Sequence, residues 1–276
     1  MRLAIESWAQ TFRLAEPFVI SSGAQTDQPT FQVRLTDESG RVGRGEACGA
    51  SDDETPGSMI AAIESVRARL AQPIDREALL DVLPPGGARF AVDSALWDLE
   101  AKQGLGDPFT RSGLKPGPVT SDQTIGIRSL DEYAAAARAL ADYRDIKVKV
   151  GADDPIAALA AVRREAPRSR LIVDPNQAWS VDQLQRLVPE LLALDVALIE
   201  QPIPVGAERE LDGFRAPIPL CADELIHDVR DLDRAQGRFQ VINIKLDKAG
   251  GLTNALKLAD EAEARGFQLM VGCMNG

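Results

Sequence analysis

The sequence predicts an α/β protein built as a parallel (β/α)₈ barrel with a smaller α+β domain in front of it. The first observation is a series of five short apolar runs between residues 145 and 247, separated by helical patterns. Each run ends at a charged residue, and the steps between these residues are 25, 26, 23 and 22: Lys149, Asp174, Glu200, Asp223 and Lys245. Each step fits one strand, one helix and two short loops. The second observation is that residues 1–50 are β-rich and lack this rhythm.

The first 115 residues are predicted to form the smaller domain, with the barrel domain at 116–276. The predicted strands are Leu3–Trp8, Thr30–Leu35 and Arg41–Ala47, with a hairpin turn at 37–40. Pro17–Gln28 is predicted to be a polar surface loop. Apolar residues at helical spacing predict helices over 59–70, 75–83 and 90–104, and the glycine- and proline-rich stretch 104–118 predicts the boundary.

The barrel is predicted to begin with a strand at 124–127 and a helix at 130–142, ahead of the five charged strand ends. Phe267–Val271 is the predicted seventh strand, and the chain reaches Gly276 without an eighth. A closed barrel of this kind has eight strands. We therefore expect a C-terminally incomplete barrel that belongs to a longer polypeptide.

Composition narrows the classes of function. The net charge is −11 and the pI is near 4.7, which argues against nucleic acid or an anionic membrane as partner. Cys48, Cys221 and Cys273 form neither a metal-binding spacing nor a disulfide framework. With no signal-like start and no apolar run of membrane length, a cytoplasmic location is expected. A homo-oligomer is left open.

Three acidic residues end consecutive predicted strands. The carboxyl ends of parallel barrel strands share one face, so Asp174, Glu200 and Asp223 are expected to meet there. An all-carboxylate ligand set suits Mg²⁺, with Mn²⁺ as an alternative, rather than Zn²⁺. The alternative interpretation is that such carboxylates only cap helix N-termini.

Two lysines of one strand are expected to point the same way. Lys147 and Lys149 are two residues apart, which places both side chains on the barrel interior. Adjacent ammonium groups are expected to lower each other's pKa, so that one could act as a base. Lys245 ends a strand across the ring. Two bases on opposite sides of one carbon would allow 1,1-proton transfer, with a metal stabilising the enediolate.

Several motifs resemble the muconate-lactonising branch of the enolase superfamily. They are Lys-Val-Lys at 147–149, Val-Asp-Pro-Asn at 173–176, Glu-Gln-Pro at 200–202, Cys-Ala-Asp-Glu at 221–224, Asn-Ile-Lys-Leu-Asp-Lys-Ala-Gly-Gly at 243–251 and Gly-Cys-Met at 272–274. Within that branch the chain most resembles the dipeptide epimerases, above all the L-Ala-D/L-Glu epimerases. The resemblance covers nearly the whole chain. It implies an enolase-type modified barrel with an N-terminal capping domain, and Mg²⁺-dependent epimerisation of a dipeptide.

The resemblance also implies roles for individual residues. Lys149 and Lys245 would be the acid/base pair, and the three carboxylates would bind the metal. The remaining residues would contact the substrate or support the ligands: Lys147, Thr124 and Cys273 in the first group, and Asn176 and Glu224 in the second. The 17–28 loop would select the substrate. In the Ala-Glu epimerases it often supplies an arginine, which is absent here, so the charge of the substrate side chain stays open.

Other functions remain compatible with the same residues. N-succinylamino-acid racemases, o-succinylbenzoate synthases and muconate cycloisomerases would share the lysines and the metal ligands. A Schiff-base aldolase would need one lysine and no carboxylate cluster. A non-enzymatic alternative is an inactive truncated barrel or a binding protein. Dependence on a metal separates the aldolase from the proton-transfer enzymes. The non-enzymatic alternative predicts no α-proton exchange in any substrate.

Overall fold

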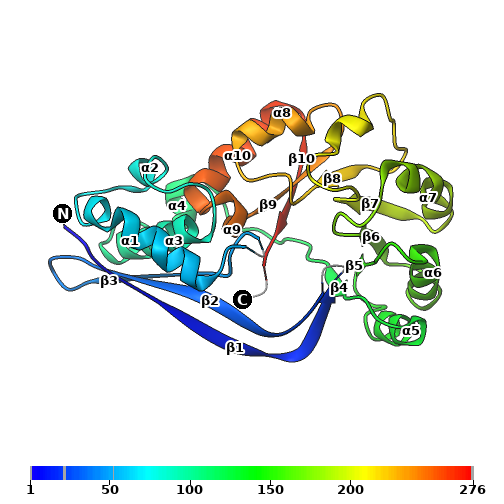
Figure 1. Cartoon of the computed structure of the whole chain (residues 1–276), viewed down its shortest axis with the longest axis horizontal. Coiled ribbons are helices and arrows are strands. Elements are labelled where there is room, and N and C mark those ends of the chain that lie inside the picture. The colour runs from blue at the N-terminus through cyan, green and yellow to red at the C-terminus, as the bar shows by residue number, and fades with distance from the viewer. Residues whose placement is uncertain (1, 21–22, 52, 275–276) are drawn as a thin grey trace.

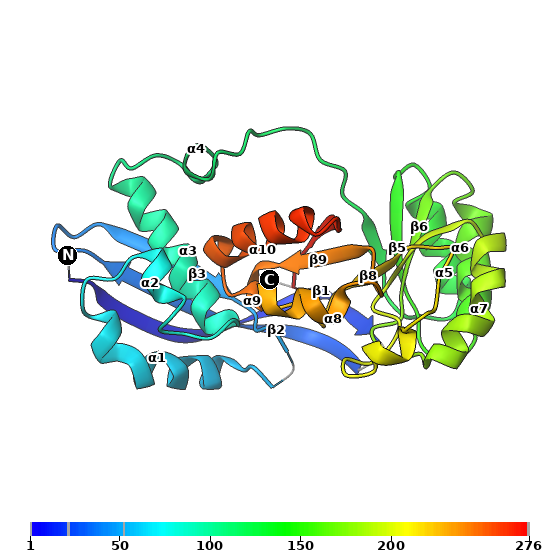
Figure 2. The ribbon, with the colours of Figure 1, turned by 90° about the horizontal axis from the view of Figure 1, so that it is seen from above.

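The computed structural model describes residues 2–20, 23–51 and 53–274. The molecule is elongated, with a three-stranded antiparallel sheet and its helices toward one end and a seven-stranded sheet toward the other (Figures 1 and 2). The predicted class, an enolase-type barrel domain with an N-terminal α+β capping domain, is confirmed. Within the described ranges no helix is long and apolar enough to span a membrane.

The capping domain packs its helices on one side of its sheet. The strands are β1 (Ala4–Ile20), β2 (Gly23–Thr36) and β3 (Val42–Ala47), and the helices are α1 (Pro56–Leu70), α2 (Arg76–Leu79) and α3 (Gly87–Lys102). Alternate residues of β2, including Phe31 and Val33, are buried against these helices. On β3 a Cβ at Gly43 or Gly45 would come within about 2 Å of a backbone oxygen of α3, so two glycines let this helix lie directly on the strand.

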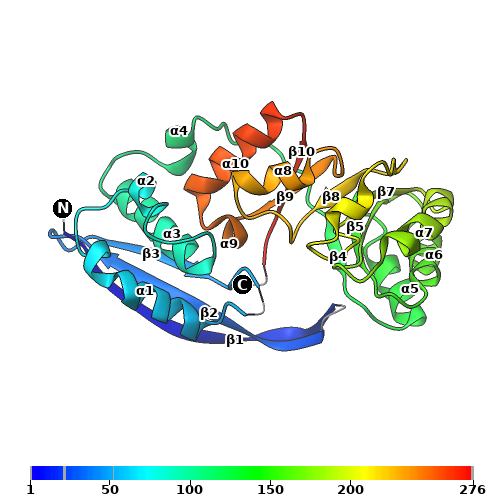
Figure 3. The same ribbon diagram turned by 45° about the horizontal axis from the view of Figure 1, so that its top comes forward.

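The predicted surface loop at Pro17–Gln28 is wrong. β1 and β2 continue as a long hairpin through this region, with pairing from Ala4↔Thr36 to Ile20↔Gly23 and a register shift between Arg13 and Phe18. Residues 21 and 22 lie outside the described part. The hairpin runs along the molecule toward the first barrel strand (Figures 1 and 3), where the Ile127 N–H donates to the Val19 carbonyl at 2.9 Å. This backbone contact joins the hairpin to the barrel domain.

The barrel domain follows α4 (Pro108–Ser112) and a long connection. Its strands are β4 (Gln123–Ile125), β5 (Asp145–Lys149), β6 (Arg170–Asp174), β7 (Val196–Glu200), β8 (Leu220–Ala222), β9 (Val241–Lys245) and β10 (Gln268–Gly272). They pair in chain order and all in parallel. In the described residues β4 and β10 are the two edges, so this seven-stranded sheet is open, as the sequence predicted.

Helices cover the outer side of this curved sheet, with short helical turns in its loops (Figure 1). They are α5 (Leu130–Ala139), α6 (Pro155–Glu165), α7 (Val181–Ala193), η1 (Glu208–Leu211), η2 (Val229–Asp231), α8 (Leu232–Ala235), α9 (Leu246–Ala249) and α10 (Leu252–Ala264). The main core lies between these helices and the strands. A second, small apolar cluster on the inner side includes Ile172, Leu198 and Val241. The inner side then becomes charged toward the carboxyl ends of the strands.

The two domains are joined by a set of contacts that we call the domain clamp, formed by Arg89, Asp93 and Trp97 of α3 with Gly250-Gly251 and Thr253. The buried Arg89 guanidinium donates to the carbonyls of Ala249 (2.8 Å) and Gly250 (3.1 Å). Thr253 Oγ1 donates to Asp93 (2.5 Å) and accepts from Trp97 Nε1 (3.0 Å). Both glycines have positive φ, and a Cβ on either would collide with Arg89 or Asp93.

Candidate active site

Six charged side chains meet at the carboxyl ends of β5 to β9, and we call them the strand-end cluster: Lys147, Lys149, Asp174, Glu200, Asp223 and Lys245. Parallel register places Lys149 beside Asp174 on β6, and Glu200 beside Cys221, two residues before Asp223. The order across the sheet is therefore lysine, three carboxylates, lysine. The prediction that these residues share one face agrees with this placement.

Direct ion pairs hold the cluster together. Lys147 Nζ lies 2.7 Å from Glu200 Oε1 and 2.9 Å from Asp174 Oδ2. Lys149 Nζ lies 2.6 Å from the same Asp174 oxygen, and Lys245 Nζ lies 2.7 Å from Asp223 Oδ2. The carboxylates are fully buried, and the lysines are nearly so. Because burial of an unpaired charge is costly, these pairings are what make the cluster tolerable inside the protein.

The charged side chains of the cluster shift the pKa values of two lysines in a direction that the sequence did not predict. Burial alone would lower the pKa of Lys147, but attraction by Asp174 and Glu200 outweighs it and raises that pKa well above its usual range. The expected depression of this lysine's pKa is therefore wrong, because its charged neighbours are mostly carboxylates. For Lys245, burial is likewise outweighed by Asp223, so its pKa is raised.

The three carboxylates respond differently to their surroundings. Burial opposes ionisation of all three. In Asp174 the attraction of Lys147 and Lys149 outweighs burial and lowers the pKa, and in Asp223 Lys248 and Lys245 do the same. In Glu200, burial and the nearby Asp174 carboxylate dominate and raise the pKa to about 7. Glu200 is thus the central carboxylate and the least well compensated.

The carboxylates suit a divalent cation by donor chemistry, although their present geometry is set by lysines. Among the described residues no group of three acidic, histidine or cysteine side chains is already arranged to hold a metal. The ammonium groups lie against the carboxylate oxygens instead. One oxygen, Glu200 Oε2, is buried and has no hydrogen-bond partner within the described ranges. An unpaired buried acceptor costs about 1–3 kcal/mol, and a hard cation would satisfy it.

The predicted supporting residues lie on one side of the cluster. Asn176 accepts from Lys149 Nζ (2.8 Å) through Oδ1, donates to Glu224 Oε1 (3.1 Å), and its backbone N–H donates to Asp174 (2.9 Å). Asn176 has a positive φ of 45°, which asparagine tolerates better than most residues. Thr124 of β4 is exposed and lies in register with Lys147.

Cys273 follows the strand-end residue Gly272, which is paired with Lys245. Its side chain is exposed. Thr124 and Cys273 therefore lie beyond the two ends of the cluster, on the strands that flank it. Contact of either residue with a substrate stays a prediction.

Sequence reasoning missed three buried polar residues that contact the cluster. Lys248 Nζ lies 2.6 Å from Asp223 Oδ1 and also donates to the Asp223 carbonyl. Gln201 Oε1 accepts the Asp223 N–H at 2.9 Å. Asn243 Nδ2 donates to Glu200 Oε1 at 2.9 Å. Asn243 could have been found, because it precedes Lys245 by two residues as Lys147 precedes Lys149. Lys248 lies in a helical turn, where strand periodicity has no meaning.

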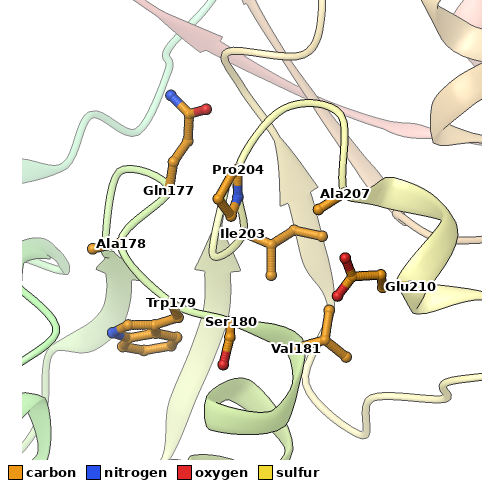
Figure 4. Close-up of a pocket in the computed structure, with 9 residues that line it drawn as sticks. All are labelled: Gln177, Ala178, Trp179, Ser180, Val181, Ile203, Pro204, Ala207 and Glu210. Carbon is orange, nitrogen blue, oxygen red and sulfur yellow. The ribbon is translucent and has the colours of Figure 1, made fainter.

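Two cavities lie near the strand ends, outside the row of carboxylates. The smaller, about 250 Å³, lies between the loops after β6 and β7 and is lined by Trp179, Ile203 and Glu210 among others (Figure 4). The larger, about 530 Å³, includes Glu224 and His227 with Pro85 of the capping domain. It therefore lies where the capping domain faces the barrel.

Comparison with known proteins agrees with this arrangement. Residues 4–109 match the N-terminal domain of the mandelate racemase/muconate lactonizing enzyme family, and residues 130–276 match the enolase C-terminal domain-like family. The chain is 38% identical over 274 residues to L-Ala-D/L-Glu epimerase of Escherichia coli, covering 98% of this chain and 85% of that protein. It is 45% identical over 200 residues to N-acetyl-D-glutamate racemase of a Pseudoalteromonas species, covering 72% and 63%.

Solved structures show the same likeness. An enolase family member from Agrobacterium tumefaciens, described as having homology to dipeptide epimerases and solved with sodium and L-Ala-L-Glu, superposes with a TM-score of 0.93 at 38% identity, covering 99% of this chain and 84% of that one. A dipeptide epimerase from Enterococcus faecalis, complexed with Mg and L-Leu-L-Tyr, superposes with a TM-score of 0.87 at 26% identity, covering 99% and 83%.

The fold and the matched relatives define an isomerase of the epimerase and racemase type. More particularly, the chain belongs to the mandelate racemase/muconate lactonizing enzyme family of the enolase superfamily.

Proposed function

We propose that this enzyme inverts the α-carbon of an N-acylated amino acid, a dipeptide first of all, by 1,1-proton transfer. The observation that carries the proposal is the order of the strand-end cluster. Lys149 and Lys245 lie at opposite ends of a row of three buried carboxylates, each paired with a different aspartate. A substrate carbon above this row would have one lysine on each face.

The two lysines take complementary roles. One, unprotonated, removes the α-proton, and the other, protonated, returns a proton to the opposite face. The number of protons on the pair is unchanged over a turnover, and exchanging their roles gives the reverse reaction. Lys147, held by Asp174 and Glu200, keeps a positive charge beneath the reaction centre. This charge favours the negative charge that develops on the substrate carboxylate.

The donor set supports Mg²⁺ as the cofactor, with Mn²⁺ as a functional substitute. Asp174, Glu200 and Asp223 would hold the ion, which when bound supplies positive charge that stabilises an enediolate. Magnesium accompanies the dipeptide in the solved E. faecalis relative. The chain's own contribution is to bury the three carboxylates beside one another on adjacent strands.

Glutamate is the proposed residue at the reacting centre. The two curated relatives described above carry the names L-Ala-D/L-Glu epimerase and N-acetyl-D-glutamate racemase. Both names describe inversion of a glutamate whose nitrogen is acylated. The first candidate substrate is therefore L-Ala-L-Glu, and the second, favoured by the 45% identity, is N-acetylglutamate. They differ in whether the acyl group carries an amino group.

Deuterium incorporation tests the proposal directly. The protein is incubated with Mg²⁺ in D₂O with L-Ala-L-Glu, L-Ala-D-Glu, both N-acetylglutamate enantiomers, N-succinylamino acids and a panel of L,L-dipeptides. Mass spectrometry then reads exchange, and chiral chromatography reads inversion. We expect both readouts with an N-acylated glutamate. Exchange confined to N-succinylamino acids would reject the substrate, and no exchange anywhere would reject the proton-transfer function.

A further inference from the structure

The Glu200 carboxylate is held by one of its two oxygens. Oε1 accepts hydrogen bonds from Lys147 Nζ (2.7 Å) and from Asn243 Nδ2 (2.9 Å). Oε2 is equally buried but has no hydrogen-bond partner in the part of the chain that the structure describes. A carboxylate held in this way has its orientation set and still has one acceptor to offer.

The two donors reach Glu200 from opposite directions along the sheet. Lys147 comes from β5 and Asn243 from β9, and each of these strands is two places from β7 in the sheet order. On both strands the residue two positions later is a lysine paired with an aspartate, Lys149 with Asp174 and Lys245 with Asp223. Thus β5 and β9 each provide one donor to Glu200 and one lysine to a neighbouring aspartate.

The two donors to Glu200 differ in charge, and the difference has a chemical consequence. The ammonium group of Lys147 contributes a positive charge, while the Asn243 amide donates a hydrogen bond without adding one. Four lysines already contact the carboxylates of the row: Lys147, Lys149, Lys245 and Lys248. A fifth at position 243 would repel a divalent cation, and an acidic residue there would repel Glu200. An amide orients the carboxylate without adding a charge, although its own Oδ1 is buried with no hydrogen-bond partner among the described residues.

Space for this amide comes from the neighbouring strand. A Cβ at Gly272 of β10 would lie 2.7 Å from Asn243 Oδ1, 2.9 Å from Nδ2 and 3.1 Å from Lys245 Cε. These distances are shorter than ordinary van der Waals contact. Gly272 is not one of the glycines with a positive φ. A side chain at this position would therefore be disfavoured by steric overlap with Asn243 and not by backbone strain.

We propose that Asn243 is a positioning residue that turns Glu200 so that Oε2 faces the cation site, with Gly272 providing the space it needs. The identity of the cation rests on the proposed function, but the positioning of Glu200 does not require turnover. The proposal can therefore be tested by metal affinity alone, in the absence of any substrate.

The test compares Mn²⁺ binding to the wild-type protein and to Asn243→Leu by isothermal titration calorimetry and electron paramagnetic resonance. Leucine is close to asparagine in shape and removes the donor. Loss of a group that orients a metal ligand typically weakens affinity about 10- to 100-fold, and we expect a change in that range. The control is Asn254→Leu, which removes another buried amide donor, to the Ala249 carbonyl at 2.8 Å and the His227 carbonyl at 3.4 Å, neither of which belongs to a residue of the cluster. Its Mn²⁺ dissociation constant should stay within about twofold.

Gly272→Ala provides a second test that retains every donor and crowds the amide. It should also weaken Mn²⁺ binding, and it decides the matter if Asn243→Leu fails to fold. Wild-type affinity in a folded Asn243→Leu or Gly272→Ala variant would overturn the proposal, as would equal weakening in Asn254→Leu. Mn²⁺ binding is measured without substrate. A negative result in the epimerase assay would therefore reject the proposed function without deciding whether Asn243 positions Glu200.

Discussion

The strand-end cluster and the domain clamp both bury charge, but they compensate it in different ways. In the clamp, the Arg89 guanidinium donates to backbone carbonyls and Asp93 accepts from Thr253, so each charge is satisfied by neutral dipoles. In the cluster, carboxylates are paired with ammonium groups. Backbone carbonyls are fixed by the chain, whereas a lysine side chain can move. A carboxylate of the cluster can then exchange its ammonium partner for a cation, and the ammonium group can pair with a substrate carboxylate. The clamp therefore pairs charges with fixed dipoles, whereas the cluster pairs charges with charges.

The largest expected effect is on proton transfer. Lys149→Ala and Lys245→Ala should each slow epimerisation on the order of 10³-fold, in the range for loss of an acid/base group. Each variant should still exchange deuterium into one stereoisomer, since one base remains. The measurement is exchange into each separated stereoisomer in D₂O. Full epimerisation by either variant would exclude the two-base mechanism. Lys257→Ala, which removes an exposed lysine paired with Glu77, is the matched control.

Removal of metal should abolish turnover without unfolding the protein. After dialysis against a chelator, exchange should fall by at least about 10³-fold, because several kcal/mol of charge stabilisation are lost. The fold should persist, since Lys147, Lys149 and Lys245 still neutralise the carboxylates. Exchange with and without restored Mg²⁺, together with circular dichroism, checks both parts. Unfolding on chelation would mean that the lysine pairs do not support the cluster.

The clamp should respond to a single methyl group. Gly251 has φ +113°, and a Cβ there would lie 2.4 Å from Asp93 Oδ2. We expect Gly251→Ala to lower the free energy of unfolding by about 3 kcal/mol through strain and overpacking. Gly266→Ala is the matched control, with φ +83° and no atom within 4 Å, and should cost only about 1 kcal/mol. Urea denaturation measures the unfolding free energy of both variants. An equal loss of stability in the two would show that the clamp adjusts to the added methyl group without cost.

The last effect develops only when the pH is changed, and it concerns a carboxylate between the two regions. Asp247 accepts the Cys48 N–H of the capping domain at 2.8 Å, and burial raises its pKa to about 6. The folded state therefore binds a proton that the unfolded chain releases near pH 4, so this group's contribution to stability falls as pH rises from about 4 to about 6. Relative to that of wild type, the free energy of unfolding of Asp247→Asn should therefore rise by up to about 3 kcal/mol between pH 4 and pH 8. Urea denaturation of both proteins at pH 4 and pH 8 measures this change. An equal difference in unfolding free energy between variant and wild type at the two pH values would contradict the prediction.

Features that depend on local chain properties were predictable. Side chains alternate along a strand, and a βα unit has a characteristic length, so the positions of Lys147, Lys149, Asp174, Glu200, Asp223 and Lys245 follow from spacing alone. The same rule, applied at Lys245, would have added Asn243. The hairpin at Pro17–Gln28 was missed because its polar residues are compatible with a loop, and its pairing is decided by the partner strand.

What the sequence by itself determined is the order of chemical groups around the barrel, because that order follows from strand periodicity and chain connectivity. What only the tertiary structure decided is the state of those groups. Lys147 was expected to lose affinity for its proton beside Lys149 and instead holds it more tightly, because folding brings Asp174 and Glu200 against it. The roles of Lys248 and Gly251 likewise depend on Asp223 and Asp93, which are distant in sequence. Burial and contacts between residues distant in sequence determine the pKa values of these groups and the space around them. Local spacing along the chain contains no information about either.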